Sequence, residues 1–344
     1  MKKSDRRYPR PMSATASAPE LVRRPAHPAL AGLVAGIVGY QQRAERPVER
    51  RQPAGSLLPL VLSFGDPLEV VALSDGEGAG RHRSFVAGFM RGHATTRFER
   101  SQRCVQVYLT PLGAYRLLGA PGRDLAGRIL PVGDVAPALA GSLPDRLAAA
   151  GSWGERLALV EDAVLRLAAA GAGPEPEPFV AWMWDRIQAS GGQARIGELV
   201  ERTGWSGRHA VARFRDQVGL TPKAAAAVVR FEHAAADLGR LPLAQVAARH
   251  GYADQSHLTR EVVRYAGEPP GVLAAQRRPT AHTALGLEPR PGFRWGRSRS
   301  VCSAPVATAS APASPQSCVT GIGSAGVAGV VEVYEGVAEF AQQR

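Results

Sequence analysis

Arg, His and Ser residues cluster in two segments about 47 residues apart, and such side chains can bind nucleic acid. The first cluster follows Gly204 and starts at Ser206, and the second follows Gly251 and starts at Asp254. Arg pairs bidentately with guanine in the major groove, while Ser, His and Gln hold phosphates or base edges. Because these contacts require a rigid element that fits the groove, the segments around the clusters must be helices or strands of defined spacing.

Three other residues could carry out chemistry: His82, His93 and Cys104. A metal site favours tighter grouping of its ligands, and Arg81 and Arg83 would repel a cation at His82. Cys104 lies in an apolar run and is interpreted as a buried small hydrophobe. The sequence contains no nucleophile and base motif, phosphate loop or dinucleotide fingerprint. We therefore expect no enzyme activity, no metal and no cofactor.

Composition limits the class of protein. The 344 residues include 42 Lys and Arg against 30 Asp and Glu, a formal charge of +12, and 45% are hydrophobic, which excludes a wholly disordered or collagen-like chain. The three Cys form no CxxC pair, so neither a disulfide scaffold nor a structural zinc site is indicated. The charge excess lies in residues 1–27 (7 basic, 2 acidic) and 179–278 (14 basic, 9 acidic). These two segments are the candidates for binding an anionic partner.

Residues 28–170 are expected to form a β-rich domain of a sensor or dimerisation type that ends in a helix. Short apolar runs broken by Gly and Pro favour strands there. Helical spacing of apolar residues predicts an amphipathic helix over 153–170, whose apolar stripe is either core or a dimer surface. The runs interpreted as strands are Leu57–Phe64, Leu68–Leu73, Ser84–Met90 and Cys104–Thr110.

The remaining segments are read from composition. Residues 1–27 are basic and rich in Pro, Ser and Ala, which predicts a disordered arm. Residues 171–178 form a Gly, Pro and Glu linker. Residues 179–278 are expected to be a helical domain, and 279–344 a low-complexity, disordered tail.

The apolar run Ala29–Tyr40 follows two Arg residues and superficially resembles the core of a signal peptide. It has about 12 residues, fewer than the roughly 20 that a membrane span needs, and no small-residue cleavage site follows. We interpret it as the first buried element of a domain, and we expect a cytoplasmic location and no membrane partner.

Two copies of one helical pattern occur within residues 179–278. In each copy an apolar helical face ends at a Gly, and a capping residue then begins a second helix. A helix, a short turn and a capped helix form a helix-turn-helix unit, whose second helix can enter a DNA major groove. The matching residues are Ile196, Leu199, Val200, Gly204, Trp205 and Ser206 in the first copy, and Leu243, Val246, Ala247, Gly251, Tyr252 and Asp254 in the second.

An Ala-rich helix should separate the two copies. Thr221-Pro222 is a strong start signal, because Thr can cap and Pro suits the first helical position. Continuing to about Leu238, this helix would be about 25 Å long. Successive major grooves on one face of DNA lie about 34 Å apart, so two units on such a strut could bind adjacent turns of one duplex.

At these residues the chain resembles the two-unit DNA-binding domain of AraC/XylS-type transcription regulators. The resemblance covers about 100 residues and implies an α+β protein, with a β-rich sensor-like domain followed by an all-α double helix-turn-helix domain. It implies a sequence-specific DNA-binding transcription regulator, an activator or a repressor, and not an enzyme. The stretches that carry it are Ser206-Gly207-Arg208-His209 with Phe214, Gly219-Leu220-Thr221-Pro222-Lys223, Arg230-Phe231-Glu232-His233-Ala234 and Gly251-Tyr252-Ala253-Asp254-Gln255-Ser256-His257-Leu258.

Three positions depart from the family pattern. Ala210 stands where the family usually has Leu, Val262 where it usually has Phe, and Pro269 precedes Pro270. The first two shrink core side chains, which predicts a looser or less stable unit.

The repeat selects which face of each second helix points outward. Leu258 and Val262 map onto Ala210 and Phe214, so these pairs should face the core and Val211 should turn sideways. Arg208 and Arg260 are then the best base-edge candidates, whereas Arg213 either contacts phosphate or is only solvated. The residues expected at the DNA interface are Ser206, Arg208, His209, Ala212, Arg213, Arg215, Gln255, Ser256, His257, Arg260 and Arg264.

Two hypotheses about the N-terminal domain remain open. In the first it binds a small-molecule effector that controls the DNA-binding domain. In the second it mediates only protein interaction or oligomerisation, and DNA binding is unregulated. The expected partners are double-stranded DNA, a small-molecule effector, RNA polymerase and a second copy of the chain in a homodimer.

Overall fold

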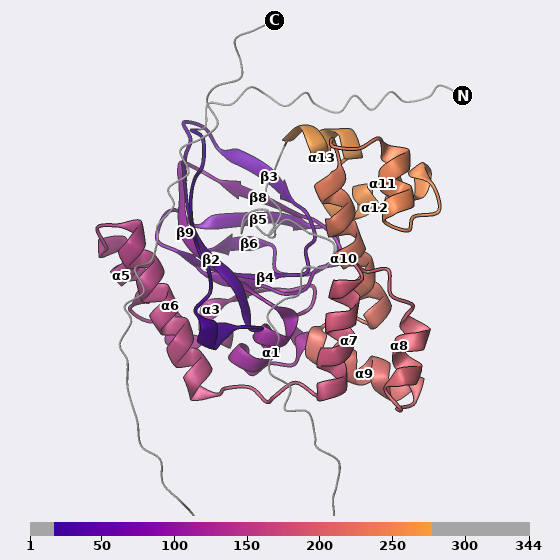
Figure 1. The fold of residues 1–344 in the computed structure, drawn as a ribbon. Helices are drawn as coiled ribbons and strands as arrows, with labels where there is room; N and C mark the ends of the chain where they lie inside the picture. Colours follow the sequence, from indigo (N-terminus) through magenta and orange to yellow (C-terminus); the bar gives the residue numbers. More distant parts are fainter. Residues whose placement is uncertain (1–16, 277–344) are drawn as a thin grey trace, which may run out of the picture.

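The computed structural model describes residues 17–276, which form a β-rich domain followed by a helical domain (Figure 1). The α+β class expected from the sequence is confirmed. Residues 1–16 and 277–344, which include most of the expected arm and the whole tail 279–344, lie outside the described residues. Within residues 17–276 no helix is long and apolar enough to cross a membrane.

Six strands form the larger, wholly antiparallel sheet. In spatial order they are β1 (Glu20–Arg24), β2 (Val34–Arg43), β9 (Ser101–Leu109), β4 (Leu58–Ser63), β7 (Phe85–Ala87) and β10 (Ile129–Pro131). Val107 of β9 lies opposite both Ile37 and Leu60, and all three are buried. This register places one continuous apolar layer on the face that the helices cover.

Four strands form the smaller sheet, in the order β3 (Val48–Gln52), β8 (Ala94–Phe98), β5 (Leu68–Leu73) and β6 (Gly80–His82). A second buried cluster that includes Val70, Phe98 and Cys104 draws on both sheets. Along β9, therefore, Cys104 faces the smaller sheet, whereas Val105 and Val107 belong to the core on the helical side. The two sheets face each other across this cluster.

Helices cover the outer face of the larger sheet. The longest of them begins with a capping box, in which Ser152 and Glu155 hold each other's backbone amides, and ends at Gly171 in the left-handed conformation. It spans residues 153–170 as predicted, and Leu157 and Val160 on its apolar stripe are buried in the core. The elements are a 3₁₀ turn (Pro28–Leu30), α1 (Pro111–Leu118), α2 (Gly122–Leu125), α3 (Val132–Val135), α4 (Pro137–Ala140), α5 (Leu143–Ala149) and α6 (Trp153–Ala170).

The expectation of a disordered arm over residues 1–27 is wrong for residues 20–24. They form β1, the edge strand of the larger sheet, which pairs along the whole of its length with β2. Val22 is buried, the Trp153 indole N–H donates to Glu20 at 2.9 Å, and Arg24 lies 2.8 Å from Glu161. The strand is defined by pairing with β2, which lies outside the segment, so the composition of the segment alone does not reveal it.

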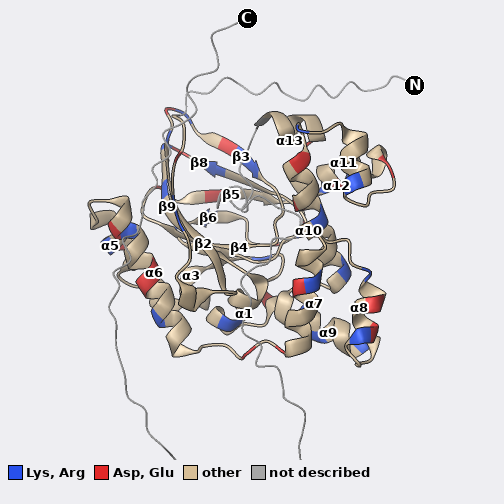
Figure 2. Ribbon diagram, viewed as in Figure 1, with Lys and Arg blue, Asp and Glu red and all other residues tan. Residues whose placement is uncertain are grey.

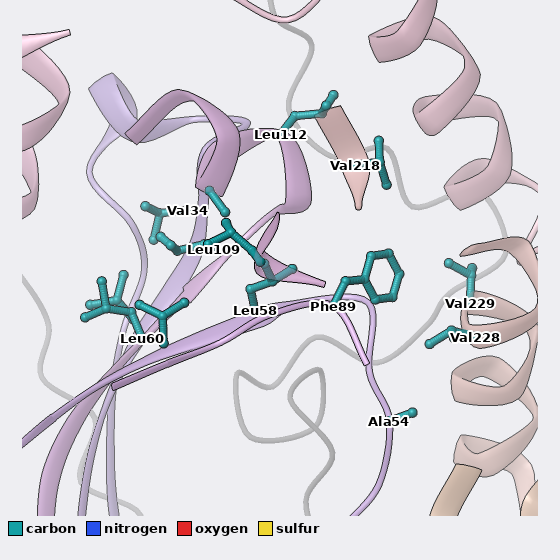
Figure 3. Close-up of a cluster of buried hydrophobic side chains, with 14 of the residues drawn as sticks. Val34, Ala54, Leu58, Leu60, Phe89, Leu109, Leu112, Val218, Val228 and Val229 are labelled. Carbon is teal, nitrogen blue, oxygen red and sulfur yellow. The ribbon is translucent and has the colours of Figure 1, made fainter. Parts of the chain in front are cut away.

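The helical domain begins at α7 (Pro178–Ala189), so the connecting segment ends at 177. It continues with α8 (Ile196–Arg202), α9 (Gly207–Val218), α10 (Pro222–Asp237), α11 (Leu243–Arg249), α12 (Gln255–Ala266) and α13 (Pro270–Gln276). Its core is continuous with that of the β domain. Figure 3 shows Phe89 between the leucines of the sheet and Val228 and Val229 of α10. Phe89 also meets Trp184 edge-to-face, with ring centroids 6.0 Å apart.

Burial makes Cys104 a probe of folding. The side chain is completely buried, and the loss of solvation raises the pKa of its thiol to about 12. Because the thiolate is the reactive form, we expect Cys104 of the native chain to resist alkylation by iodoacetamide at pH 9. In denaturant, where the pKa returns to its ordinary value, it should react fully. Peptide mass spectrometry of Cys104 measures this, and rapid modification of the folded chain would contradict the burial.

Candidate nucleic-acid interface

We call α9 and α12, the second helix of each helix-turn-helix unit, the reader helices. The first of them, α9, is defined by its caps and by its buried face. The hydroxyl of Ser206 accepts the backbone N–H of His209 at 3.3 Å, and Gly219 ends the helix at a φ of +101°. Ala210 and Phe214 are wholly buried. The residues left exposed on the opposite side are Arg208, Ala212 and Arg215.

The second reader helix, α12, repeats this arrangement. Asp254 accepts the backbone N–H of His257 at 2.7 Å, and Gly267 ends the helix in the left-handed conformation. Leu258 and Val262 are wholly buried. The burial of these pairs agrees with the frame predicted from the repeat, and the residues exposed on α12 include Gln255, Ser256, Arg260 and Arg264.

The two reader helices lie at opposite ends of α10 (Figure 1). The hydroxyl of Thr221 accepts the N–H of Ala224, and Pro222 takes the first helical position, as the sequence indicated. With 16 residues, α10 is about 24 Å long. Arg230 on α10 lies over the ring of Tyr252, 5.1 Å from its centroid, and thus connects the strut to the second unit.

Arg213 differs from the other expected interface residues. Its Nε donates a 2.7 Å hydrogen bond to Glu177, and a second guanidinium nitrogen lies 3.2 Å from Asp216. The hydrogen bond to Glu177 raises the pKa of Arg213, so the cation is firmly held. The guanidinium therefore ties α9 to the segment before α7, and sequence spacing alone could not separate this role from a phosphate contact.

Each reader histidine packs against the aromatic residue of its own turn. His209 lies beside Trp205 with ring centroids 4.6 Å apart, and His257 meets Tyr252 edge-on at 5.2 Å. Tyr252 is buried, whereas Trp205 remains 53% exposed beside the first reader helix. Trp205 was not among the expected interface residues, although the repeat of an aromatic residue at this turn was a signal for it.

Basic side chains surround a cavity of about 680 Å³ between α12, the strut and the β domain. Lys223 and Arg230 of α10, Arg264 of α12 and Arg91 of the β domain contribute to its lining, together with Glu261. Figure 2 shows Lys and Arg on α9, α10 and α12, with acidic residues among them. The helical domain thus carries positive charge near both readers and between them.

His82, His93 and Cys104 do not form a common site. His82 bonds to the carbonyl of Gly78 at 2.9 Å, and His93 packs against Gly267 at the end of α12. Among residues 17–276, no group of three or more His, Cys, Asp or Glu side chains is placed to hold a metal ion.

A cavity of about 180 Å³ lies between the two sheets of the β domain. All the side chains that line it are uncharged. Its polar groups include Gln52 and Thr96, whose side chains lie 3.4 Å apart, and Tyr108, which donates to Gln106 at 2.7 Å. The full lining is Gln52, Pro53, Ala54, Gly55, Leu57, Pro59, Val61, Leu68, Val70, Phe85, Ala87, Gly88, Met90, Gly92, Ala94, Thr96, Gln102, Gln106, Tyr108 and Ile129.

Two helix pairs lie at opposite ends of one strut, and the second helix of each pair is N-capped and has exposed Arg side chains. This arrangement defines a helix-turn-helix domain of the DNA-binding class. Residues 199–276 match the family model described as "Helix-turn-helix domain". Over that stretch the resemblance to the DNA-binding domain of AraC/XylS-type regulators is confirmed.

Several solved structures are similar to this chain. The C-terminal domain of AraT, a response regulator from Geobacillus stearothermophilus, is 20% identical, with 32% of this chain and 93% of that one covered and a TM-score of 0.28. ToxT from Vibrio cholerae O395 is 6% identical, with 76% and 97% covered and a TM-score of 0.40. The same protein bound to (E)-4-(8-methylnaphthalen-1-yl)but-3-enoic acid is 7% identical, with 76% and 98% covered and a TM-score of 0.42. No curated protein matches the chain significantly.

Proposed function

We propose that this protein binds a specific duplex sequence by placing α9 and α12 in successive major grooves, and that it thereby regulates transcription. The observation that carries the proposal is the pairing of two exposed, N-capped reader helices at opposite ends of one 16-residue strut. Such a strut holds the two helices at a fixed separation, so a single chain can span about one turn of DNA.

The two readers are assigned different base preferences. Arg208 and Arg260 are exposed, and we assign them to guanine edges, which Arg contacts bidentately. Arg260 corresponds to Ala212 in the first reader, where an apolar contact to a thymine methyl replaces the cation. The recognised half-sequences are therefore unequal.

The other residues expected at the interface are assigned to positioning. Gln255 is the first residue of α12, where free backbone amides attract phosphate. His209 and His257 occupy corresponding places behind the caps, and Arg215 and Arg264 follow later on the same helices. We assign these residues, with Ser206 and Ser256, mainly to the DNA backbone.

Replacing Arg260 with Ala should weaken binding to a duplex selected from random sequence by about 1 to 3 kcal/mol. It should also relax the preference at one base pair. Fluorescence anisotropy against a set of single-base variants of the site measures both effects. Arg166→Ala, a change of an exposed Arg on α6, is the control and should leave binding unchanged. An equal loss of affinity for every duplex would show that Arg260 contacts a phosphate and not a base.

We further propose that the β domain senses a small molecule in the cavity between its sheets. The volume of about 180 Å³ and the uncharged lining suit a compact, mainly apolar, neutral ligand with one or two hydrogen-bonding groups. An apolar cavity of about 150 Å³ is large enough for benzene. The alternative is a domain that only mediates interaction, with a second copy or with RNA polymerase.

A thermal-shift screen of small neutral aromatic compounds separates these two possibilities. A compound at 100 times its dissociation constant should stabilise the chain by about 2.7 kcal/mol. Ala87→Leu, which fills the cavity from β7, should abolish the shift. Absence of any shift across the panel would favour the unregulated alternative.

A further inference from the structure

The cavity of about 180 Å³ between the two sheets is called the neutral cavity below, because its lining is uncharged. Two segments of the β domain lie between it and the second reader helix. The first joins β3 to β4 and includes Ala54, and the second leads into β8 and includes His93. Gln52, Ala54 and Gly92 line the cavity on the inner side of these segments. The neighbouring groups on the outer side contact α12, so the same short stretches of backbone touch both sites.

The outer contacts are made to the last backbone carbonyls of α12. The N–H of Ala54 donates to the carbonyl of Tyr265 at 2.9 Å, and the Arg51 guanidinium donates to the carbonyl of Gly267. The His93 ring nitrogen Nδ1 lies 3.5 Å from the carbonyl of Arg264. The final carbonyls of a helix lack partners within the helix. Here the β domain supplies partners for them.

Close packing accompanies these hydrogen bonds. Gly267 has a φ of +75°, and a Cβ at this position would lie 2.6 Å from the His93 ring. The linking segment is also fixed on its other side, because Ser56 is wholly buried and lies 3.5 Å from the Gln188 amide of α7. A shift of this segment would therefore be transmitted to α12 rather than absorbed in solvent.

The first reader helix is held by a different part of the β domain. Arg123 of α2 pairs with Asp216 of α9, and a Cβ on Gly122 would lie 2.5 Å from the carbonyl of Gln217. None of these four residues lines the neutral cavity. A change in the cavity thus has a direct path to α12 through the contacts of residues 51–54 and His93. Its path to α9 is indirect and runs through α2, because the cavity-lining Gly88 packs against the backbone of Leu125.

We infer that Arg51, Ala54 and His93 are positioning residues of the second reader helix, and that occupancy of the neutral cavity adjusts α12 relative to α9. This inference rests on the proposed function. A ligand that favours one position of α12 changes the affinity for DNA through the second half-site, by a factor in the usual range of about 5 to 150. The first half-site keeps its contacts.

Arg51→Ala and Arg123→Ala in the full chain form a matched pair that tests positioning. Arg51→Ala should weaken binding to the complete duplex about fivefold or more, and should have no effect once the second half-site is scrambled. Arg123→Ala should show the mirror pattern with the first half-site. Arg51→Lys, which keeps a donor, should restore binding. Equal losses at both half-sites from Arg51→Ala would overturn the inference.

Hydrogen exchange without DNA provides an independent readout. Arg51→Ala should accelerate exchange in the last turn of α12 and at Ala54, but not in α9. Ala87→Leu, a permanent occupant of the cavity, should alter exchange in 53–57 and α12 more than in α9. Unaltered exchange in α12 for either variant would overturn the inference even if DNA binding is confirmed. If the wild-type chain bound no duplex, the proposed function would be rejected. The exchange measurements would then still decide whether the β domain positions α12.

Discussion

Phe214→Ala is expected to lower the free energy of unfolding by about 3 to 5 kcal/mol, because it leaves a large cavity in a rigid core. Phe214 is wholly buried on the inner face of α9. It belongs to the core cluster that also contains Val218 and Leu199 of the first unit. The neighbouring Ala210 is already small and cannot fill the space. Urea unfolding followed by circular dichroism measures the loss.

Val211→Ala is the matched control, since Val211 lies on the same helix but is only partly buried. Its cost should stay below about 1.5 kcal/mol, the upper end for loss of a small group at such a site. Similar costs at both positions, or a larger one at Val211, would mean that the helix is rotated from the frame described. Arg208 and Ala212 would then no longer face DNA.

DNA affinity should fall about a thousandfold or more between 50 and 200 mM salt. Neutralising about six phosphates releases their condensed counterions, and the logarithm of affinity then falls steeply with the logarithm of salt. We expect the exposed cations on both readers and Lys223 at the start of α10 to make such contacts. Anisotropy titrations of the full chain at several salt concentrations give the slope.

Arg215→Ala and Arg264→Ala probe the origin of that slope. Each should reduce it by about one and weaken binding on all sequences alike, as expected for phosphate contacts. Arg166→Ala should leave the slope unaltered. A slope near zero for the unmodified chain would exclude the electrostatic interface proposed for the two readers.

Elements with local signals were predicted correctly from the sequence. The α6 helix has a capping box and a left-handed Gly at its ends, and both readers have a side-chain cap followed by a Gly stop. The frame of the readers was recoverable because the unit occurs twice, and Leu258 and Val262 resolve the ambiguity at Val211. These signals act within a few residues, so no tertiary information is needed to read them.

Elements that depend on distant partners were missed. β1, β3 and β8 have mixed polar sequences and become strands through pairing with neighbours, and the apolar run at β7 is much shorter as a strand than expected. The short helices α1 to α5 follow one another in a stretch read only as β-rich. Pairing with other strands, and not propensity, decides the strands among these elements. The helix α1 instead begins at a local signal, a capping Thr110 followed by Pro111.

The same limit applies to the interface. The sequence left Arg213 open between a phosphate contact and a solvated side chain, because its partner Glu177 lies 36 residues away. Arg51 and His93 carried no sequence signal for the second reader, because their partner carbonyls at the end of α12 lie more than 170 residues later. Such roles follow from the docking of the two domains and require the three-dimensional structure.

Hydroxyl-radical footprinting of the full chain on a duplex selected from random sequence tests the central claim most directly. At one chain per duplex, we predict two protected stretches whose centres lie about 10 to 10.5 base pairs apart, with unequal sequences. Arg208→Ala should weaken protection of one stretch and Arg260→Ala that of the other. A single protected stretch, or a symmetric palindrome beneath one chain, would contradict the assignment of α9 and α12 as two distinct readers.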